Sequence, residues 1–404
     1  MRIDSSFTTM MLILLFVVAV AATGNLSAQA GTYEIKELGS PWPEDPLCPQ
    51  QTPNSNATGI NEQGDVVGVA EREYYGTDGF CHYEQHAVIW HPDDTITDLG
   101  GIPPRTAWST GKGINDNGDG VVGFADIDCP AAPCTMATPS YWNPTDGMIG
   151  ITDGNDWPTG WAWGINNAHQ VALRYRNRPY YWDASEGLRV IWDPSFPAGA
   201  YGEAWEINNN GLIVGQMQAV LTGSELHAYT YDSNTDTLVD LHDPAAGPQS
   251  VAYGVNDNGD VAGLVERSNY FLTPAIWPAA GGRIDLPDSV FGPYYIYGQA
   301  EHINDLGDVV GYDSSDIVQP AIGWVAFDVL GGNTDRVALV DLLDPADAAQ
   351  WEIYYGFEIN DAQQITGFGL FNGETRAFLM TPAALFADGF ESGDTSQWSS
   401  VVTN

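Results

Sequence analysis

One short phrase built around an asparagine recurs seven times along the chain, and it constrains the fold more than any other feature. The copies read GINEQGDVVG, GINDNGDGVVG, GINNAHQVAL, EINNNGLIVG, GVNDNGDVAG, HINDLGDVVG and EINDAQQITG. Their asparagines are Asn61, Asn115, Asn166, Asn208, Asn256, Asn304 and Asn360, at intervals of 42 to 56 residues. A repeat of this length marks one supersecondary unit that buries its apolar surface only against its neighbours.

Each repeat contains four short β-like segments. In the first repeat they are residues 57–61, 65–70, 86–90 and 95–99, rich in apolar and β-branched residues and separated by Gly, Asn, Asp and Pro. After the N-terminal region, no long segment has the 3.6-residue periodicity of an amphipathic helix. The sequence therefore predicts an all-β protein of four-stranded units, as in a β-propeller. A β-solenoid is the competing architecture, but its repeats are usually shorter.

The two ends of the repeat region complement each other. The seventh repeat has three predicted strands, at residues 355–360, 364–368 and 376–380, but no fourth. A spare strand at residues 33–39 precedes the first repeat and resembles the fourth strand of that repeat. We therefore predict a seven-bladed β-propeller over residues 31–384, whose N-terminal strand completes the last blade and removes the exposed edges of an open array.

The repeat asparagines have a local structural explanation. In the first repeat, Asn61 would begin a type I turn and accept a hydrogen bond from the backbone two residues on. Gly64 would then adopt the left-handed conformation that closes a three-residue hairpin loop. His169 and Gln363 replace this glycine in the third and seventh repeats, which predicts local strain there. All seven asparagines are thus predicted to be turn residues and not site residues.

A second motif falls at the third strand of several repeats. It reads His86-Ala87-Val88, His227-Ala228-Tyr229 and Arg376-Ala377-Phe378. With the asparagine phrase, it resembles the signature of the bacterial extracellular HAF-repeat family over about residues 31–382. The resemblance implies a secreted repeat protein and no particular activity.

The two termini are predicted to lie outside the repeat region. Residues 1–30 are interpreted as a signal peptide, because an apolar run at residues 10–22 precedes the small residues of Ala28-Gln29-Ala30. An uncleaved membrane anchor is the alternative. Residues 385–404 form a polar, Gly- and Ser-containing tail that resembles the tail of many secreted bacterial proteins, and a sorting or export role is its hypothesis. The predicted location is therefore extracellular, either secreted or on the cell surface.

The charge of the chain excludes one class of partner. Thirteen Lys and Arg residues stand against 53 Asp and Glu, which gives a net charge of −40. Binding of nucleic acid through its phosphates is therefore excluded. Such a chain could attract calcium, but the loops 153–156 and 313–316 lack the spacing of a known calcium loop. No metal or cofactor is predicted, calcium is left open, and a monomer without a transmembrane segment after signal cleavage is expected.

Four cysteines are compatible with disulfides in an exported protein. Cys48 and Cys81 are predicted to pair, because their loops lie on the same face of the propeller. Cys129 and Cys134 share one loop and are predicted to form a second disulfide. None of the spacings matches a structural zinc site.

The strand directions separate short turns from long loops. The asparagine turns share one face with the connections between third and fourth strands, whereas the other face, the long-loop face, collects residues 40–56, 71–85, 101–112, 126–139, 193–204 and 287–300. Loops held by a rigid scaffold are common binding sites, and aromatic rings suit flat sugar faces. The predicted ligand-binding residues are Tyr74, Tyr75, Trp108, Trp157, Tyr294 and Tyr295. Trp163 and Trp205 lie inside first strands and are expected to pack between blades.

The sequence favours a non-catalytic protein that binds an extracellular carbohydrate or protein through the long-loop face. It contains no Ser-His-Asp or zinc signature, and its 53 carboxylates single out no acid–base pair. A propeller-fold polysaccharide lyase or hydrolase with carboxylates near the central channel is the main alternative, and a structural cell-surface component is another. Two or three carboxylates with a His or Tyr at the mouth of the channel would favour the enzyme.

Overall fold

The computed structural model describes residues 32–383 except 44, 49–52, 129–134, 155–157, 222–224, 246, 268–270, 288, 290, 293–294 and 316–319. The predicted signal peptide and C-terminal tail lie outside the described residues. Nearly all regular structure in the described part is β-strand, joined by a 3-10 helix η1 (Leu339–Leu342) and a short α2 (Pro345–Ala348). Neither of these helices has the length or apolar character needed to cross a membrane.

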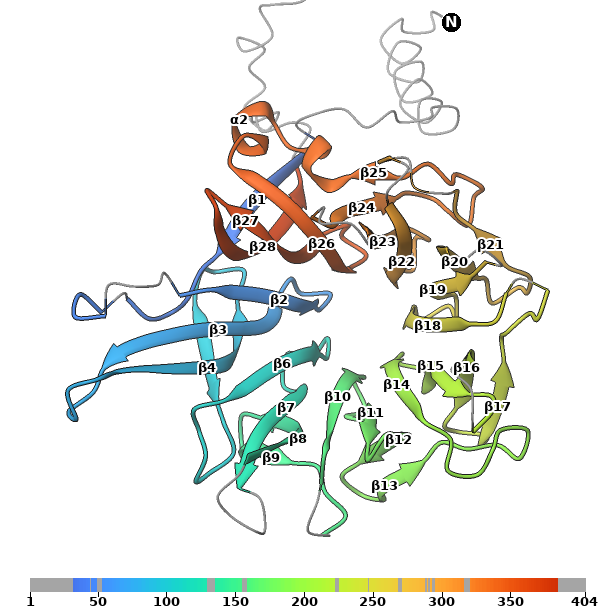
Figure 1. Ribbon diagram of the computed structural model, residues 1–404, viewed down its shortest axis with the longest axis horizontal. Coiled ribbons are helices and arrows are strands. Elements are labelled where there is room, and N and C mark those ends of the chain that lie inside the picture. The colour runs from blue at the N-terminus through green and yellow to red at the C-terminus, as the bar shows by residue number, and fades with distance from the viewer. Residues whose placement is uncertain are drawn as a thin grey trace, which may run out of the picture.

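The strands form antiparallel meanders arranged around a common centre, with the first strand of each meander innermost (Figure 1). Three successive sheets each take their strands from one repeat. They comprise β2 (Ser55–Ile60), β3 (Val66–Tyr75), β4 (Cys81–Trp90) and β5 (Ile96–Gly100); β6 (Ser109–Ile114), β7 (Val121–Asp128), β8 (Thr135–Asn143) and β9 (Gly147–Gly150); and β10 (Gly160–Ile165), β11 (Val171–Tyr175), β12 (Arg178–Asp183) and β13 (Gly187–Val190).

The next meanders continue the same pattern around the centre. They comprise β14 (Gly202–Ile207), β15 (Leu212–Gln218), β16 (Leu226–Asp232) and β17 (Thr237–Asp240); β18 (Ser250–Val255), β19 (Val261–Glu266), β20 (Leu272–Trp277) and β21 (Ile284–Asp285); and β22 (Tyr295–Ile303), β23 (Val309–Ser315), β24 (Ile322–Ala326) and β25 (Val337–Ala338). The last two belong to one eight-stranded sheet, because Leu272 of β20 pairs in parallel with Tyr297 of β22.

The remaining sheet joins the two ends of the chain. It is ordered β1 (Tyr33–Leu38), β28 (Glu374–Pro382), β27 (Ile365–Phe371) and β26 (Trp351–Ile359). Strand β1 runs antiparallel to β28, with Tyr33 opposite Pro382 and Leu38 opposite Ala377. The predicted pairing of the N-terminal strand with the last repeat is confirmed.

The apolar core lies between neighbouring sheets. One cluster joins Val67 and Ile89, from β3 and β4, to Ile114, Val121 and Ala125 from β6 and β7. Each sheet thus buries its apolar side chains against the next sheet, which is why the sequence repeats with the period of one meander. A single meander would leave these side chains in water.

The asparagine turns form as the sequence predicts. Asn61 Oδ1 accepts hydrogen bonds from the backbone N–H of Gln63 at 3.1 Å and of Asp65 at 2.8 Å. Gly64 has φ +83°, and the residues that replace it, His169 and Gln363, have φ +57° and +58°. Such values favour glycine, so these two side chains are held in a conformation that non-glycine residues seldom adopt.

The same asparagines also connect neighbouring repeats, which the sequence analysis did not predict. The side-chain Nδ2 of one asparagine donates to the backbone carbonyl oxygen of the asparagine in the next repeat. These donor–acceptor distances are 3.2 Å for Asn61 to Asn115, 3.1 Å for Asn166 to Asn208, 2.8 Å for Asn208 to Asn256, 2.9 Å for Asn256 to Asn304, 3.0 Å for Asn304 to Asn360 and 3.0 Å for Asn360 to Asn61. Asparagine suits this position because its amide both accepts and donates.

We expect Asn256→Ala to lower the free energy of unfolding by about 1–3 kcal/mol, because it leaves several buried backbone groups without partners. Asn256 donates to Asn304 and accepts from the backbone N–H of Asp260 at 2.8 Å. Asn143→Ala is the matched control. Asn143 Oδ1 also accepts hydrogen bonds in a turn, from the backbone N–H groups of Thr145 and Asp146, but this turn joins β8 to β9 within one sheet. Urea unfolding would measure both variants. Equal losses would mean that the contact between repeats adds nothing.

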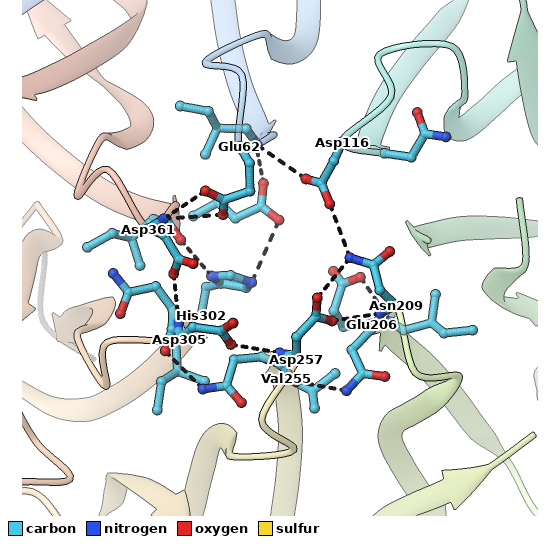
Figure 2. Close-up of a pocket in the computed structure, with 18 of the residues that line it drawn as sticks. Glu62, Asp116, Glu206, Asn209, Val255, Asp257, His302, Asp305 and Asp361 are labelled. Carbon is cyan, nitrogen blue, oxygen red and sulfur yellow. Dashed lines mark hydrogen bonds and ion pairs between the residues drawn. The ribbon is translucent and has the colours of Figure 1, made fainter. Parts of the chain in front are cut away.

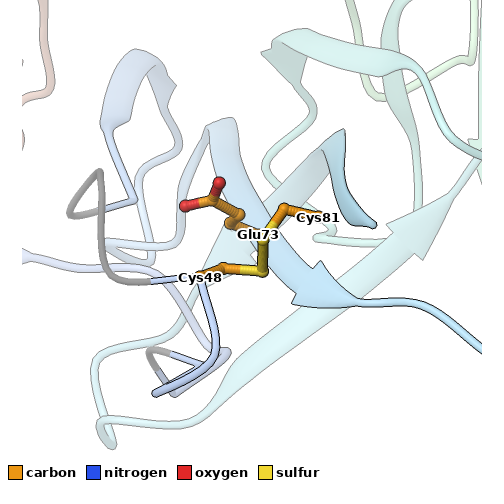
Figure 3. Close-up of side chains that lie close together, drawn as sticks. All are labelled: Cys48, Glu73 and Cys81. Atoms are coloured by element: carbon orange, nitrogen blue, oxygen red, sulfur yellow. A yellow bond between two sulfur atoms is a disulfide. The ribbon is translucent and has the colours of Figure 1, made fainter. Parts of the chain in front are cut away.

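One predicted long loop is a hairpin instead. Within residues 71–85, strand β3 continues as far as Tyr75 and strand β4 begins at Cys81. The hairpin that they form projects beyond the neighbouring sheets (Figure 1). The sequence does not indicate these strands, because both faces of the extension carry polar residues. Glu71, Arg72 and Glu73, for example, follow one another along β3. The predicted Cys48–Cys81 disulfide is confirmed and ties this hairpin to the preceding segment (Figure 3). Cys129 and Cys134 lie outside the described residues.

Candidate functional site

The residue two places before each repeat asparagine marks the centre of the molecule. In four repeats it is glycine, and in the other three it is Glu206, His302 or Glu358. Each of these positions lies near the end of an innermost strand, next to a register shift in its pairing. The three exceptions therefore place titratable side chains at the common centre of the sheets.

Glycine at the equivalent positions makes room for these side chains. A Cβ atom on Gly164 would lie 2.3 Å from Oε1 of Glu206, and one on Gly59 would lie 2.9 Å from Oε2 of Glu358. Both distances are too short for a carbon atom beside a carboxylate oxygen. The glycine of one repeat thus accommodates the glutamate of another repeat.

A cavity of about 380 Å³, the central cavity, lies at this centre. Glu206, His302 and Glu358 line it, together with the residue three places before each asparagine. These wall residues are Thr58, Lys112, Trp163, Trp205, Tyr253, Glu301 and Phe357. A cavity of this size with aromatic walls and a few converging polar groups is typical of a ligand-binding site.

One arc of the wall is aromatic. The ring centroids of Trp163 and Trp205 are 4.4 Å apart, and those of Trp205 and Tyr253 are 5.5 Å apart. The two tryptophans thus pack against each other between neighbouring sheets, as expected, and both also line the central cavity. Consecutive innermost strands bring the same repeat position together, which produces a continuous aromatic surface.

Two glutamates provide acid–base groups beside this surface. Oε2 of Glu358 accepts a hydrogen bond from the backbone N–H of Ile60, and Oε1 of Glu206 accepts one from the backbone N–H of Ile207 at 2.9 Å. Burial raises the pKa of both carboxyl groups, and the negative charge of Glu206 raises the pKa of Glu358 further. Repulsion between the two charges disfavours the state in which both carboxyl groups are ionised.

His302 is held as a neutral ring next to Glu358. Its Nδ1 lies 3.1 Å from the carbonyl oxygen of Ile359, so Nδ1 carries the proton and donates it. Nε2 then presents a lone pair 4.0 Å from Oε1 of Glu358. Burial lowers the pKa of His302 to about 4, which keeps the ring uncharged at neutral pH.

Lys112 and Glu301 complete the charged part of the wall. Burial lowers the pKa of Lys112 to about 8, and burial raises the pKa of Glu301 to about 7. Lys112 Nζ also lies 5.2 Å from the ring centroid of Trp163. The central cavity thus combines one lysine with three glutamates, and burial shifts the pKa of each toward its uncharged form.

The end of the cavity at the asparagine turns is surrounded by a ring of polar side chains, the mouth ring (Figure 2). Each member directly follows a repeat asparagine. The members are Glu62, Asp116, Asn167, Asn209, Asp257, Asp305 and Asp361. Glu206, His302 and Glu358 line both the mouth and the central cavity, so the two are continuous.

Hydrogen bonds connect the mouth ring from one repeat to the next. For example, Asp305 accepts from the backbone N–H of Asp257 at 2.9 Å, and Glu62 accepts from that of Asp361 at 3.2 Å. Burial raises the pKa of Glu62 to about 7, and the nearby charges of Asp361 and Asp116 also raise it. The mouth is therefore a strongly negative region.

The structure offers little for a bound metal ion. In the described part of the chain, one group of three Cys, His, Asp or Glu ligand atoms comes close together, at Cys48, Glu73 and Cys81. The two sulfurs of this group are bonded to each other (Figure 3), so they are not free to bind a metal ion. In the two loops considered for calcium, Asp313 is paired with Arg336, and Asp153 accepts from the hydroxyl of Tyr175 at 2.7 Å.

The predicted ligand-binding aromatics are spread over separate places. Tyr74 stacks on His82 with centroids 5.3 Å apart, at the outer end of the β3–β4 hairpin, where Tyr75 is 43% exposed. Trp108 lies before β6, with its ring centroid 5.4 Å from that of Tyr83. Tyr295 begins β22, in a different sheet. Trp157 and Tyr294 lie outside the described residues. Three of the described members thus lie on or against the β3–β4 hairpin, whereas Tyr295 lies in another sheet.

The raised carboxyl pKa values predict that the protein is less stable at mildly alkaline pH. Glu62 and Glu301 both have folded-state pKa values of about 7, above the ordinary value of 4.5. Their contribution to stability is complete below about pH 4.5 and is lost as the pH rises through about 7. We expect the melting temperature to fall between about pH 6.5 and pH 8.

Glu301→Gln should reduce this pH dependence, because it removes one of the titrating groups. Two pKa shifts with the opposite effect on stability act mainly outside the range from about pH 6.5 to pH 8. The pKa of His302 is lowered from 6.5, so its effect falls below that pH, and that of Lys112 is lowered only to about 8. Melting curves of the unchanged protein and of Glu301→Gln, recorded across this pH range, would test the prediction. A melting temperature that rises over this range would contradict the prediction.

Neither a protein-family model nor a curated protein sequence matches the chain. Solved structures do match it, among them the β-propeller domain of the Trilobed protease from Pyrococcus furiosus. That alignment covers 82% of this chain and 96% of the other, at 9% identity and a TM-score of 0.48. Virginiamycin B lyase from Staphylococcus aureus aligns over 86% and 99%, at 11% identity and a TM-score of 0.45. TolB from Acinetobacter baumannii aligns over 78% and 80%, at 12% identity and a TM-score of 0.40. At this level of similarity, we draw no conclusion about activity.

Proposed function

We propose that the protein is a secreted, seven-bladed β-propeller of the HAF-repeat type, closed by β1. The pairing of β1 with β28 and the hydrogen bond from Asn360 to Asn61 both join the last repeat to the start of the chain, which supports a closed ring. The Cys48–Cys81 disulfide is compatible with an oxidising, extracellular location.

We further propose that the protein hydrolyses a glycosidic bond of a neutral carbohydrate held in the central cavity. The observation that carries this proposal is the pair Glu206 and Glu358. Both side chains line the same cavity, burial raises the pKa of both, and the charge of the first raises the pKa of the second. A protonated carboxyl group that acts as the acid, together with a second, ionised carboxylate, is the catalytic equipment of most glycoside hydrolases.

The surroundings assign a role to each glutamate. Glu358, whose pKa is raised by both burial and the charge of Glu206, holds the proton and acts as the general acid on the leaving oxygen. Glu206 is the carboxylate that activates a water molecule or attacks the sugar carbon. His302 is a positioning residue, because its neutral Nε2 faces Oε1 of Glu358.

The charge of the cavity favours a neutral substrate and hydrolysis over elimination from a uronate. The cavity is lined by three glutamates, Glu206, Glu301 and Glu358, and by a single lysine, Lys112. The mouth ring adds five carboxylates. A uronate carboxyl group would be repelled by the ionised members of this set, whose charges act strongly in a partly water-excluded site. The aromatic arc of Trp163, Trp205 and Tyr253 offers a flat surface for an uncharged sugar ring.

A carbohydrate-binding surface on the long-loop face remains a second proposal. Trp108 and Tyr83 contact each other and are 41% and 39% exposed. Exposed, paired aromatic rings suit the face of a sugar, so this pair would extend the contact with a long substrate. It does not supply acid–base groups of its own.

The test is a glycan array screen of the secreted form of the protein, with turnover of every hit measured. We expect binding to neutral glycans and release of new reducing ends. An unsaturated product that absorbs ultraviolet light would identify a lyase instead. Binding without turnover would favour the non-catalytic alternative, and neither binding nor turnover would favour a structural surface component.

A further inference from the structure

Three buried polar atoms near the centre of the molecule have no hydrogen-bond partner in the described part of the chain. They are Nε1 of Trp163, Nε1 of Trp205 and Oδ1 of Asn56. Burying such an atom without a partner costs about 1–3 kcal/mol. Native proteins therefore seldom contain these atoms without a reason, and an absent ligand or water is one of the common reasons.

The three atoms belong to residues that line connected spaces. Trp163 and Trp205 line the central cavity, whereas Asn56 lines a second space of about 240 Å³, the side groove. Thr58, Lys112 and Phe357 line both. The side groove therefore adjoins the central cavity.

The side groove leads away from the asparagine turns. Asn56 lies at the start of β2, and Glu71, another lining residue, lies toward the end of β3, so both belong to the end of the sheet that carries the long loops. At the opposite end the mouth ring narrows the passage, because its side chains hydrogen-bond to one another. Asn209 Nδ2, for instance, lies 3.1 Å from Asp116 and 2.9 Å from Asp257. A ligand that reaches the central cavity through the side groove would therefore approach from the long-loop face.

We propose that the central cavity and the side groove together hold one neutral oligosaccharide chain, which enters from the long-loop face and places its end against Glu206 and Glu358. This inference rests on the proposed function and adds the substrate's length and direction. Asn56 is assigned to the sugar unit in the side groove. Trp163 and Trp205 are assigned to the unit in the central cavity.

The chemistry of the three atoms matches sugar hydroxyl groups. Each indole N–H needs an acceptor, and Asn56 Oδ1 needs a donor. A hydroxyl group supplies either, whereas a carboxylate or phosphate supplies acceptors alone and would meet the glutamates of the wall. Phe357 and Phe124 line the side groove as apolar surface, so both spaces combine rings with hydrogen-bonding groups.

Binding as a function of chain length tests the proposal directly. The protein would carry Glu206→Gln to prevent turnover, and the probes would be glucose, xylose and the cello-, laminari-, malto- and xylo-oligosaccharides of about two to six units. Calorimetry is expected to show affinity for at least one series that increases from one unit to two or three. A hydrogen bond of about 1 kcal/mol corresponds to about a fivefold change in affinity, which sets the scale of each step.

Substitutions then locate the two ends of the chain. We expect Asn56→Ala to weaken binding of the longest oligosaccharide about fivefold and to leave monosaccharide binding unchanged. Trp163→Phe and Trp205→Phe keep a ring but remove the N–H, and should weaken binding at every length. Trp182→Phe is the matched control, because Trp182 lies on the third strand β12 and packs on Tyr141. Melting temperatures would confirm that each variant is folded.

Two results would overturn the inference. Equal affinity for the monosaccharide and the hexasaccharide would show that the side groove holds no sugar unit, even if hydrolysis at Glu206 and Glu358 stands. Loss of monosaccharide binding in Asn56→Ala would place the ligand differently. The chain-length series needs no variant of the side groove, so it decides the question even if Asn56→Ala fails to fold. No binding in any neutral series would remove both this inference and the proposed function.

Discussion

Glu206→Gln and Glu358→Gln are each expected to lower kcat for glycoside hydrolysis by about 10²- to 10⁴-fold, the usual contribution of a positioned acid or base. Each substitution keeps the shape of the side chain and removes its ability to exchange a proton. Steady-state assays on the best substrate of the glycan screen would measure the loss. Glu352→Gln is the matched control, because Glu352 lies exposed on β26, the strand that also carries Glu358.

The leaving group of the substrate distinguishes the two roles. If Glu358 is the acid, an aryl glycoside with a very acidic phenol needs no proton, so Glu358→Gln should recover most of its activity on that substrate. Glu206→Gln should recover none of it. The pH profile gives a second measure, since burial raises the pKa of both groups, and activity should therefore persist to higher pH than ordinary carboxyl groups would allow.

Several outcomes would count against this assignment. If both variants keep full activity on natural substrates, the reaction occurs elsewhere in the molecule. If the two variants respond equally to the acidic leaving group, the roles of acid and base are not divided as proposed. Normal substrate binding by inactive variants would separate a loss of chemistry from a loss of fold.

The overall fold could be predicted from the sequence because its signals are local and repeated. Each repeat contains its own turn residues and strand pattern, and the partner of β1 followed from counting strands at the two ends. The Cys48–Cys81 disulfide followed from the alternating strand directions alone. The extension of the β3–β4 hairpin beyond Ala70 and before His86 was missed, because it lacks the alternation of apolar and polar residues that identifies a half-buried strand.

The candidate site was missed because its residues meet only in three dimensions. Glu358 accepts a hydrogen bond from Ile60, 298 positions earlier in the chain. The sequence nevertheless contained a usable signal. When the seven phrases are aligned, the residues two places before the asparagine are Gly, Gly, Gly, Glu, Gly, His and Glu. A titratable side chain is unexpected at a position that is otherwise glycine. Residues at one repeat position of a ring all face its centre, so the three exceptions belong together.

A protein that begins at Ser40, without residues 31–39, is expected to lose about 5 kcal/mol or more of its free energy of unfolding. The deletion removes Tyr33 and Leu38, which are buried, at about 1.5–3 kcal/mol each. It also removes the six residue pairs between β1 and β28 and leaves β28 as an exposed edge.

Contacts beyond the strand pairing increase the expected loss. The hydroxyl of Ser55 donates to the carbonyl oxygen of Leu38, and Nε1 of Trp90 donates to that of Gly39 at 2.8 Å. Both donors belong to the first repeat, whereas β28 belongs to the last. Strand β1 thus connects the two ends of the repeat region, and its removal should loosen the contact between them as well as one sheet.

Thermal and urea unfolding of the shortened and full-length proteins would measure this effect. Glu34→Ala is the matched control, since Glu34 is exposed on the same strand and its loss leaves the backbone pairing intact. A synthetic peptide of residues 31–39 should restore part of the lost stability by binding to the free edge of β28. An unchanged melting temperature after the deletion would show that β1 is not needed to hold the last repeat against the first. The central cavity would then owe its shape to the asparagine turns and to the apolar contacts between neighbouring sheets, such as those of Val66 with Ala377 in one cluster.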